Sequence, residues 1–257
     1  MKALFSAATG MAAQQIQIDT IANNLANVST NGFKKVRVAF EDLVYENVRT
    51  GEASAESKRP GQLEVGSGSR VIATQRDFTP GSITQTNSEL DVAIQGRGFF
   101  VVQSPDGAER FTRVGAFSVN QDSELVTQQG YPVVPGIQIP LDASEVIIAE
   151  DGAVQVRYAN STDAVSIGQL DVVDFTNVNG LKALGGNLFG ATAESGEPIP
   201  MESTDGLLLK QGFLEGSNVD IAVELVNMIM AQRSFEVTSK AVESADETMK
   251  MVNQMKR

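Results

Sequence analysis

Apolar residues recur every seven positions at both ends of the chain, which is the spacing of helices that pack side by side. Near the start the row is Leu4, Met11, Ile18 and Leu25, with a second row three positions later at Ala7, Gln14, Ile21 and Val28. Near the end the rows are Ile221, Met228, Phe235, Val242 and Met249, and beside them Ala231, Thr238, Ala245 and Val252. The pattern predicts one long helix at each end, each with a narrow apolar stripe.

The middle of the chain has a different pattern, with short alternating runs separated by turn residues. All eight prolines lie between Pro60 and Pro200, and every glycine except Gly10 lies between Gly32 and Gly216. Proline and glycine break helices and mark turns. Runs such as "LDVAIQ", "GFFVVQ" and "EVIIAEDGAVQVRY" alternate as strands do, and Asp151-Gly152 is a strong hairpin signal. We expect eight to ten short strands in an antiparallel barrel-like or sandwich domain.

These patterns predict an α+β fold, with terminal heptad-patterned helices around a central antiparallel β-rich domain. The expected segments are an N-terminal helix at 1–32, a connection with a polar insertion at 33–70, a β-rich outer domain at 71–215 and a C-terminal helix at 216–257. We expect Ser217 or Asn218 to cap the second helix, with Asp220 in its first turn. Two helices with such thin stripes are marginal alone, so we expect them to be disordered or partly ordered in the monomer. The stripes could pack on each other in one chain, or between many copies.

Composition narrows the possible functions. The net charge of −12 argues against nucleic acid and lipid insertion, and no apolar run is long enough to span a membrane. The chain has no cysteine and no histidine, so it lacks thiol nucleophiles, thiolate ligands and imidazole. Lys2 precedes a mildly apolar stretch that could be a signal peptide. Because the helical pattern continues past the would-be cleavage point, we expect no cleavage.

Enzymes built on carboxylates or on lysine remain possible, but the candidate carboxylates are scattered. Asp91, Asp171, Asp174 and Asp205 form no spaced cluster, so a carboxylate-based hydrolase is the weaker interpretation. "GRGFF" lacks the third glycine of a nucleotide-binding loop and precedes a strand, which predicts a kink between strands. We therefore expect no enzyme, no cofactor and no metal site. "KKVR", residues 34–37, could be a solvated turn or a contact with an acidic face of a neighbouring copy.

Three separated motifs resemble those of bacterial flagellar rod and hook proteins. They are "ANNLANVSTNGFKK" at residues 22–35, "LDVAIQGRGFFVV" at 90–102 and "QGFLEGSNVDIAVELVNMIMAQRSFEVTSK" at 211–240. The resemblance covers the whole chain, and the three separated motifs occur in the right order. Together these features make the resemblance specific. Within the family, the length of the chain and its polar insertion at about residues 46–65 resemble those of the distal-rod branch. Hook proteins are longer. A minor rod or hook-type subunit remains the alternative, and a secreted β-rich adhesin is the alternative from another class.

The resemblance implies a mechanical role. Family members leave the cell through the flagellar type III export apparatus without a cleaved signal peptide. They form a rigid helical tube that spans the periplasm within the basal body and transmits torque from motor to hook. The implied partners are other copies, other rod subunits, hook subunits, the P and L ring proteins, the rod cap and the export apparatus.

Residues on the two stripes and around the first motif are the expected assembly contacts. Asn23, Asn24 and Asn27 flank the first stripe, where an amide could bond to other copies, and Asn31-Gly32 would then turn the chain away. The full expected set is Leu4, Met11, Ile18, Asn23, Asn24, Leu25, Asn27, Gly32, Phe33, Ile221, Met228, Gln232, Phe235, Val242 and Met249.

Overall fold

A computed structural model of the chain describes residues 2–48, 63–159, 164–201 and 206–255. These residues form two compact units, each built from more than one stretch of sequence. Unit 1 comprises Met1–Ala26, Val36–Gln75 and Asp220–Arg257, and unit 2 comprises Asn27–Lys35 and Arg76–Val219. The units cut across the four predicted segments, whose outer-domain and rod-core roles stay predictions. Residues 49–62 of the predicted insertion and Asp205 lie outside the described residues.

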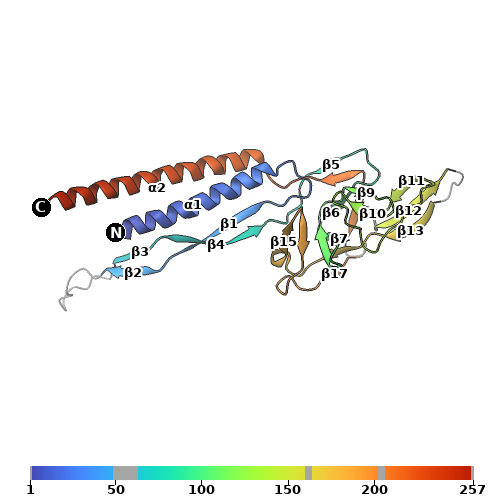
Figure 1. Cartoon of the computed structure of the whole chain (residues 1–257), viewed down its shortest axis with the longest axis horizontal. Helices are drawn as coiled ribbons and strands as arrows, with labels where there is room; N and C mark the ends of the chain where they lie inside the picture. Colours follow the sequence, from blue (N-terminus) through green and yellow to red (C-terminus); the bar gives the residue numbers. More distant parts are fainter. Residues whose placement is uncertain (1, 49–62, 160–163, 202–205, 256–257) are drawn as a thin grey trace. The chain divides into compact units, whose positions relative to one another are not determined.

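Unit 1 consists of two long helices and a two-stranded ribbon. Helix α1 spans Lys2–Ala26 and helix α2 spans Ile221–Met255, which confirms the two helices predicted from the heptad rows. They run antiparallel and side by side (Figure 1), since Gly10 lies against Thr238 and the Asn24 amide bonds to Glu224. The disorder expected of the helices in the monomer stays a prediction.

The ribbon of unit 1 pairs β1 (Val36–Asp42) with β4 (Ser69–Arg76) and β2 (Tyr45–Val48) with β3 (Leu63–Gly66). Helix α1 packs along β1. At Gly68, with φ of +117°, a Cβ would lie 2.2 Å from Thr9 Oγ1 of α1. Glycine is therefore required at the point where the ribbon approaches the helix.

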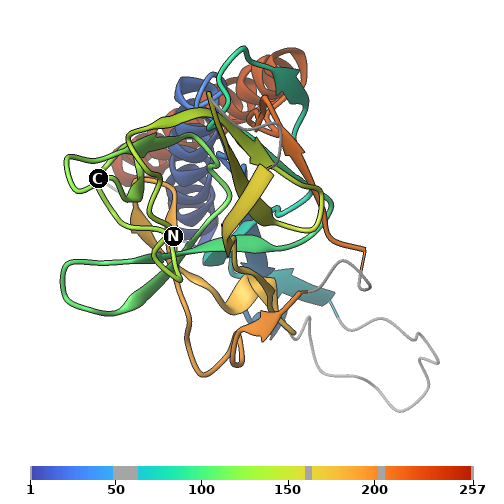
Figure 2. The same cartoon turned by 90° about the vertical axis from the view of Figure 1, so that its right-hand side faces the viewer.

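Unit 2 is the predicted antiparallel β region, and Figure 2 shows its strands from another direction. Its central sheet has the order β15-β16-β8-β7-β14-β17, and β11-β12-β13 form a second sheet. Three further pairs are β10-β9, β18-β6 and β19-β5. The expected number of strands was too low, because many are only two to four residues long; in its described part unit 2 contains β5 to β19.

The strands and one 3-10 helix of unit 2 have the following bounds: β5 Ile83–Gln85, β6 Val92–Gln95, β7 Phe99–Gln103, β8 Glu109–Thr112, β9 Phe117–Val119, β10 Leu125–Thr127, β11 Ala143–Ile148, β12 Ala153–Tyr158, β13 Ala164–Gln169, β14 Val172–Asp174, η1 Val178–Gly180, β15 Lys182–Gly185, β16 Leu188–Gly190, β17 Ile199–Pro200, β18 Leu208–Gln211 and β19 Phe213–Glu215. The predicted hairpin at Asp151-Gly152 is confirmed, since it joins β11 to β12 with Gly152 at φ +89°.

Strand β7 separates two hydrophobic cores. Because side chains alternate across a strand, Phe100 and Val102 enter one core while Phe99 and Val101 enter the other. The first core gathers aliphatic side chains from most strands of unit 2. The second is aromatic, with edge-to-face contacts that link Phe99, Phe111, Phe175, Phe189 and Phe78. Unit 2 is thus held by a dry interior of its own.

Candidate functional site

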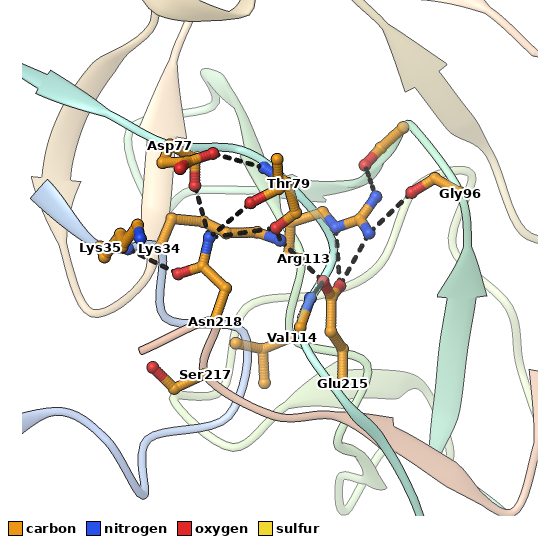
Figure 3. A network of polar contacts seen from close by, with 12 residues as sticks. Lys34, Lys35, Asp77, Thr79, Gly96, Arg113, Val114, Glu215, Ser217 and Asn218 are labelled. Atoms are coloured by element: carbon orange, nitrogen blue, oxygen red, sulfur yellow. Dashed lines mark hydrogen bonds and ion pairs between the residues drawn. The ribbon is translucent and has the colours of Figure 1, made fainter. Parts of the chain in front are cut away.

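A carboxylate buried between two cationic side chains joins three distant stretches of unit 2 (Figure 3). Glu215, the last residue of β19, accepts a hydrogen bond from Lys34 Nζ at 2.7 Å and from the Gly81 N–H at 2.9 Å. Its other oxygen accepts a bond from Arg113 Nε at 2.8 Å. The three side chains are at most 3% exposed. We call Lys34, Arg113 and Glu215 the clamp.

The remaining donors of the clamp are bound to backbone carbonyls. Lys34 Nζ donates to Thr79 O at 2.8 Å, and Arg113 donates to Gly98 O at 2.6 Å and to Gly96 O at 2.9 Å. Gly96 and Gly98 have φ of +113° and +119°, and they form the kink that "GRGFF" predicted between β6 and β7. Buried charges are tolerated when their hydrogen bonds are satisfied in this way.

Burial and the neighbouring charges of the clamp shift the pKa values of Glu215 and Lys34. Burial alone would raise the pKa of Glu215, but the charges and hydrogen bonds of Arg113 and Lys34 outweigh it and hold that pKa below its ordinary value. Burial lowers the pKa of Lys34, which Glu215 only partly offsets. Glu215 is therefore ionised at neutral pH and compensates two buried cations.

The side-chain amide of Asn218 forms hydrogen bonds with backbone groups beside the clamp. Its Oδ1 accepts the Lys35 N–H at 2.8 Å, while its Nδ2 donates to Asp77 O at 2.7 Å and to Thr79 O at 3.1 Å. With these bonds Asn218 is not free to cap α2, and Ser217 Oγ accepts the Val219 N–H ahead of the helix, so the expected cap at Ser217 or Asn218 was wrong. Asp220 is the cap instead, because its Oδ1 accepts the N–H groups of Ala222 and Val223 at 2.9 and 3.1 Å.

Gly32 and Phe33 place the N-terminal motif against the clamp. Gly32 has φ of +66°, a Cβ there would lie 2.8 Å from Val114 Cγ2, and its N–H donates to Glu215 O at 2.8 Å. The left-handed turn expected at this glycine is confirmed. Neither interpretation of "KKVR" holds for Lys34, because the chain buries this side chain on its own carboxylate.

A second polar contact lies in unit 1, where the side chain of Asn24 pairs with a strand. Asn24 Oδ1 accepts the Val36 N–H and its Nδ2 donates to Val36 O, both at 2.9 Å, so the amide acts like a paired strand residue. Nδ2 also lies 3.4 Å from Glu224 Oε2 of α2. Asn24 is 2% exposed, so its amide is used inside the chain, and its expected role in contacts with other copies stays a prediction.

The expected assembly residues fall into distinct environments. All the expected heptad residues except Ile221 are half-buried: Leu4, Met11, Ile18, Leu25, Met228, Phe235, Val242 and Met249. The side chains of Asn23, Gln232 and Ile221 are exposed, Asn27 is half-buried beyond the end of α1, and Gly32 and Phe33 are buried. Within unit 1, α2 packs on α1 with Thr238 beside Gly10 and with Ala231 buried, so the apolar stripe of α2 is used at least in part inside the chain.

The candidate catalytic carboxylates in the described residues each have surroundings of their own. Asp91 accepts the hydroxyl hydrogen bond of Thr86, Asp174 pairs with Arg97, and burial raises the pKa of Asp171. A shallow pocket of about 460 Å³ lies in unit 2, lined by Gln103, Ser104, Pro105, Gly107, Gly130, Tyr131 and Pro132, none of them acidic. The described residues hold no group of three or more side chains that could bind a metal ion. Neither described helix is long and apolar enough to cross a membrane.

Sequence analysis missed Glu215, Arg113 and Glu224. Glu215 and Glu224 stand within the third motif and Arg113 lies outside all three, and a buried charge looks the same as a surface charge in a sequence. One usable signal was present: Glu215 is the last residue of "GFLE", a short run with strand character that ends at a glycine. A charge placed where a strand should be buried indicates an internal partner.

Family models match three parts of the chain. "Flagella basal body rod protein" matches residues 4–34, "Flagellar hook protein FlgE/F/G D1 domain" matches residues 93–156, and "Flagellar basal body rod FlgEFG protein C-terminal" matches residues 210–255. The first and third models contain Lys34 and Glu215, and the second contains Arg113. The clamp thus joins the three matched regions.

Relatives match over the full length. The flagellar basal-body rod protein FlgG of Borreliella burgdorferi is 45% identical over 100% of this chain and 99% of that protein, and FlgG of Buchnera aphidicola from Acyrthosiphon pisum is 44% identical over 98% of each. In Caulobacter vibrioides, FlgG is 40% identical over all of this chain, whereas FlgF is 35% identical over 90% of it. The chain belongs to the flagellar rod and hook family, within its basal-body rod branch.

Proposed function

We propose that this chain is a structural subunit of the distal rod of the flagellar basal body. Copies polymerise into a rigid helical tube that transmits torque from motor to hook. The single observation that carries the proposal is the full-length similarity to proteins named FlgG, with residues 1–257 covered and the three family regions in order. A minor rod subunit is the weaker candidate, because FlgF matches with lower identity and coverage.

The two units support this function in different ways. Unit 1 has long helices with little interior of their own, which suits contacts made between copies. Unit 2 has two packed cores and the clamp, which suits a domain that must stay folded under load. Contacts through different faces of the same chain give an open helical assembly.

The remaining parts of the proposal follow the family resemblance. Copies are exported without a cleaved signal peptide and span the periplasm within the basal body. Other rod subunits, hook subunits, the P and L ring proteins, the rod cap and the export apparatus are the proposed partners. The chain performs no catalysis in this role and needs no cofactor.

Electron microscopy of purified basal bodies tests the proposal. A short epitope tag is inserted in residues 49–62 and detected with a gold-labelled antibody. Label along the distal shaft of the rod is the expected result. A rod without label, in cells that make and export the tagged chain, contradicts the proposal.

A deletion of residues 1–28 separates this function from that of an adhesin. The rod subunit without its first helix should be absent from basal bodies, and the cells should be non-motile. An adhesin with the same deletion would keep its ligand binding, because binding would reside in the β region. Normal motility of the deletion strain would rule out the rod function.

A further inference from the structure

Unit 2 is made of two separate stretches of sequence, so the chain passes between it and unit 1 several times. The chain enters unit 2 after Ala26, leaves it after Lys35, enters it again after Gln75 and leaves it after Val219. A force that travels along the covalent chain can reach unit 2 only through these points. We call the parts of unit 2 next to the last three of them the exit segments, and they are residues 33–35, 76–79 and 215–219.

The side-chain amide of Asn218 bonds to both of the other exit segments (Figure 3). Its Oδ1 accepts the Lys35 N–H at 2.8 Å, while its Nδ2 donates to Asp77 O at 2.7 Å and to Thr79 O at 3.1 Å. The backbone N–H of Asn218 also donates to Phe33 O at 3.4 Å. One residue therefore ties all three exit segments together within unit 2.

Two further contacts join the exit segments without Asn218. The Asp77 N–H donates to Lys35 O at 2.9 Å, and Lys34 of the clamp donates to both Glu215 and Thr79 O. Each exit segment is thus bonded to the other two. A pull on one segment is then resisted by its bonds to both others, and the bonds of such a network act together.

The strand that leads to the last exit has little hold of its own. Strand β19 has three residues, which pair with β5, and it ends at Glu215. Beyond it, Ser217 Oγ accepts the Val219 N–H at 3.3 Å, which is a bond inside the same segment. Asn218 is therefore the first polar side chain with bonds to other segments that a pull arriving from α2 would reach.

We propose that Asn218 fastens the exit segments of unit 2 to one another, so that a pull arriving along the chain from α2 is shared among all three. Its role is that of a positioning residue, since it holds the backbone of Lys35 and Asp77 in place beside its own. The mechanical use of this arrangement rests on the proposed rod function, because a subunit of a torque-carrying tube must pass load through these few peptide connections.

Pulling on single molecules of the full-length chain tests the proposal. The chain has no cysteine, so DNA handles can be attached at introduced ones. Handles at Lys240→Cys in α2 and at Leu141→Cys, a 92% exposed position of unit 2, bring the force to Val219 whether or not α2 is folded. Optical tweezers then measure how long unit 2 stays folded at constant force. Asn218→Ala should shorten this lifetime roughly tenfold or more, because backbone groups in two other segments lose their partner.

Two controls separate fastening from general stability. Ser217→Ala lies in the same exit segment but removes a hydroxyl that bonds inside it, so this substitution should shorten the lifetime far less. A second pair of handles, at Lys182→Cys and Leu141→Cys, loads unit 2 between two exposed positions of its own and does not pull on an exit. With that pair the effect of Asn218→Ala should be much smaller.

A second variant covers the case in which Asn218→Ala does not fold. Near-ultraviolet circular dichroism of the purified chain shows whether unit 2 is intact. Asn218→Asp keeps the acceptor for the Lys35 N–H and loses the donor to Asp77 O and Thr79 O, so its lifetime under force should also fall below that of the wild type.

Three outcomes would overturn the proposal. The first is an unchanged lifetime of the folded Asn218 variants under a pull from Lys240, and the second is an equal loss in Ser217→Ala. The third is an equal loss with both pairs of handles, since Asn218 would then contribute only general stability. All these measurements use the monomer, so absence of the chain from rods would refute the rod function and leave the result for Asn218 unaffected.

Discussion

The two units of the molecule differ most in how they bury apolar surface. Both hydrophobic cores lie in unit 2, whereas among the described residues of unit 1 only Ala13, Ile21 and Ala231 are buried apolar side chains. Of the 22 large apolar side chains that are exposed in the described part of the chain, sixteen belong to unit 1. Unit 2 therefore has the interior of a stable domain, while unit 1 keeps many large apolar side chains exposed.

Polar contacts in the interior follow the same division. In unit 2 the clamp is sealed from water and joins stretches of chain up to 181 residues apart. In unit 1 the contact of Asn24 with Val36 and Glu224 fixes only the place where α1 ends near β1 and the start of α2. Substitutions in one unit should therefore leave the unfolding of the other unit nearly unchanged. Four experiments test whether the two units unfold independently.

Glu215→Gln should have the largest effect, and it should act on unit 2. The amide keeps the shape but leaves Lys34 and Arg113 buried without a counter-charge, which costs about 3–5 kcal/mol of unfolding free energy. Urea unfolding followed by near-ultraviolet circular dichroism of the tyrosines measures this loss.

Glu145→Gln is the matched control, because Glu145 forms an ion pair with Arg157 in the same unit but both side chains are more than 40% exposed. Its cost should stay below about 1 kcal/mol. Equal costs for the two substitutions would show that the clamp has no special role in unit 2.

The broad fold was predictable because its signals are local. Heptad spacing identified α1 and α2, and the distribution of proline and glycine identified the β region, since each depends on neighbouring residues. The strand count was wrong because strands of two or three residues carry too little alternation to recognise. Sheet order was not predictable either, since pairs such as β18 with β6 join residues more than a hundred positions apart.

The contacts of the site depend on such distant pairings. The motif containing Lys34 pointed to a functional region, but its partner Glu215 is 181 residues away. Asn218 was a reasonable cap in the sequence, yet the fold offers its amide three backbone partners and leaves the cap to Asp220. The heptad row identified both helices, and the packing of α2 on α1 leaves Val226, Met230 and Val237 of α2 exposed.

Phe235→Asp tests the inner side of the helices and should have the next largest effect. Phe235 is half-buried against α1, so placing a charge there should weaken helix pairing in unit 1 by about 2 kcal/mol. Helix content measured by far-ultraviolet circular dichroism should fall, while unit 2 unfolds at the wild-type urea concentration. If the wild-type monomer already lacks stable helices, as the thin apolar stripes predict, then Phe235→Asp would cause no further loss of helix content.

Asn24→Ala should have a smaller effect, confined to unit 1. Without the amide, the N–H and C=O groups of Val36 lose partners in a partly buried place, at a cost of about 1–2 kcal/mol. Hydrogen exchange should speed up at the start of β1 and at the end of α1. Gln232→Ala, at an exposed position of α2, is the control and should leave exchange unchanged. Undiminished rod assembly by Asn24→Ala would mean that this contact is dispensable in the polymer.

Acid should destabilise unit 2 through the clamp, with the smallest effect of the four. The pKa of Glu215 is lower in the folded chain than in the unfolded chain, so the unfolded state binds more protons between the two values. The contribution of ionised Glu215 to the free energy of unfolding is complete above the pKa of about 4.3 in the unfolded chain. This contribution is lost as pH falls through the lower pKa of Glu215 in the folded chain. Each unit of pKa depression corresponds to about 1.4 kcal/mol. Urea midpoints for unit 2 should drop between pH 5 and pH 3 more steeply in the wild type than in Glu215→Gln, and parallel curves would show that other carboxylates dominate.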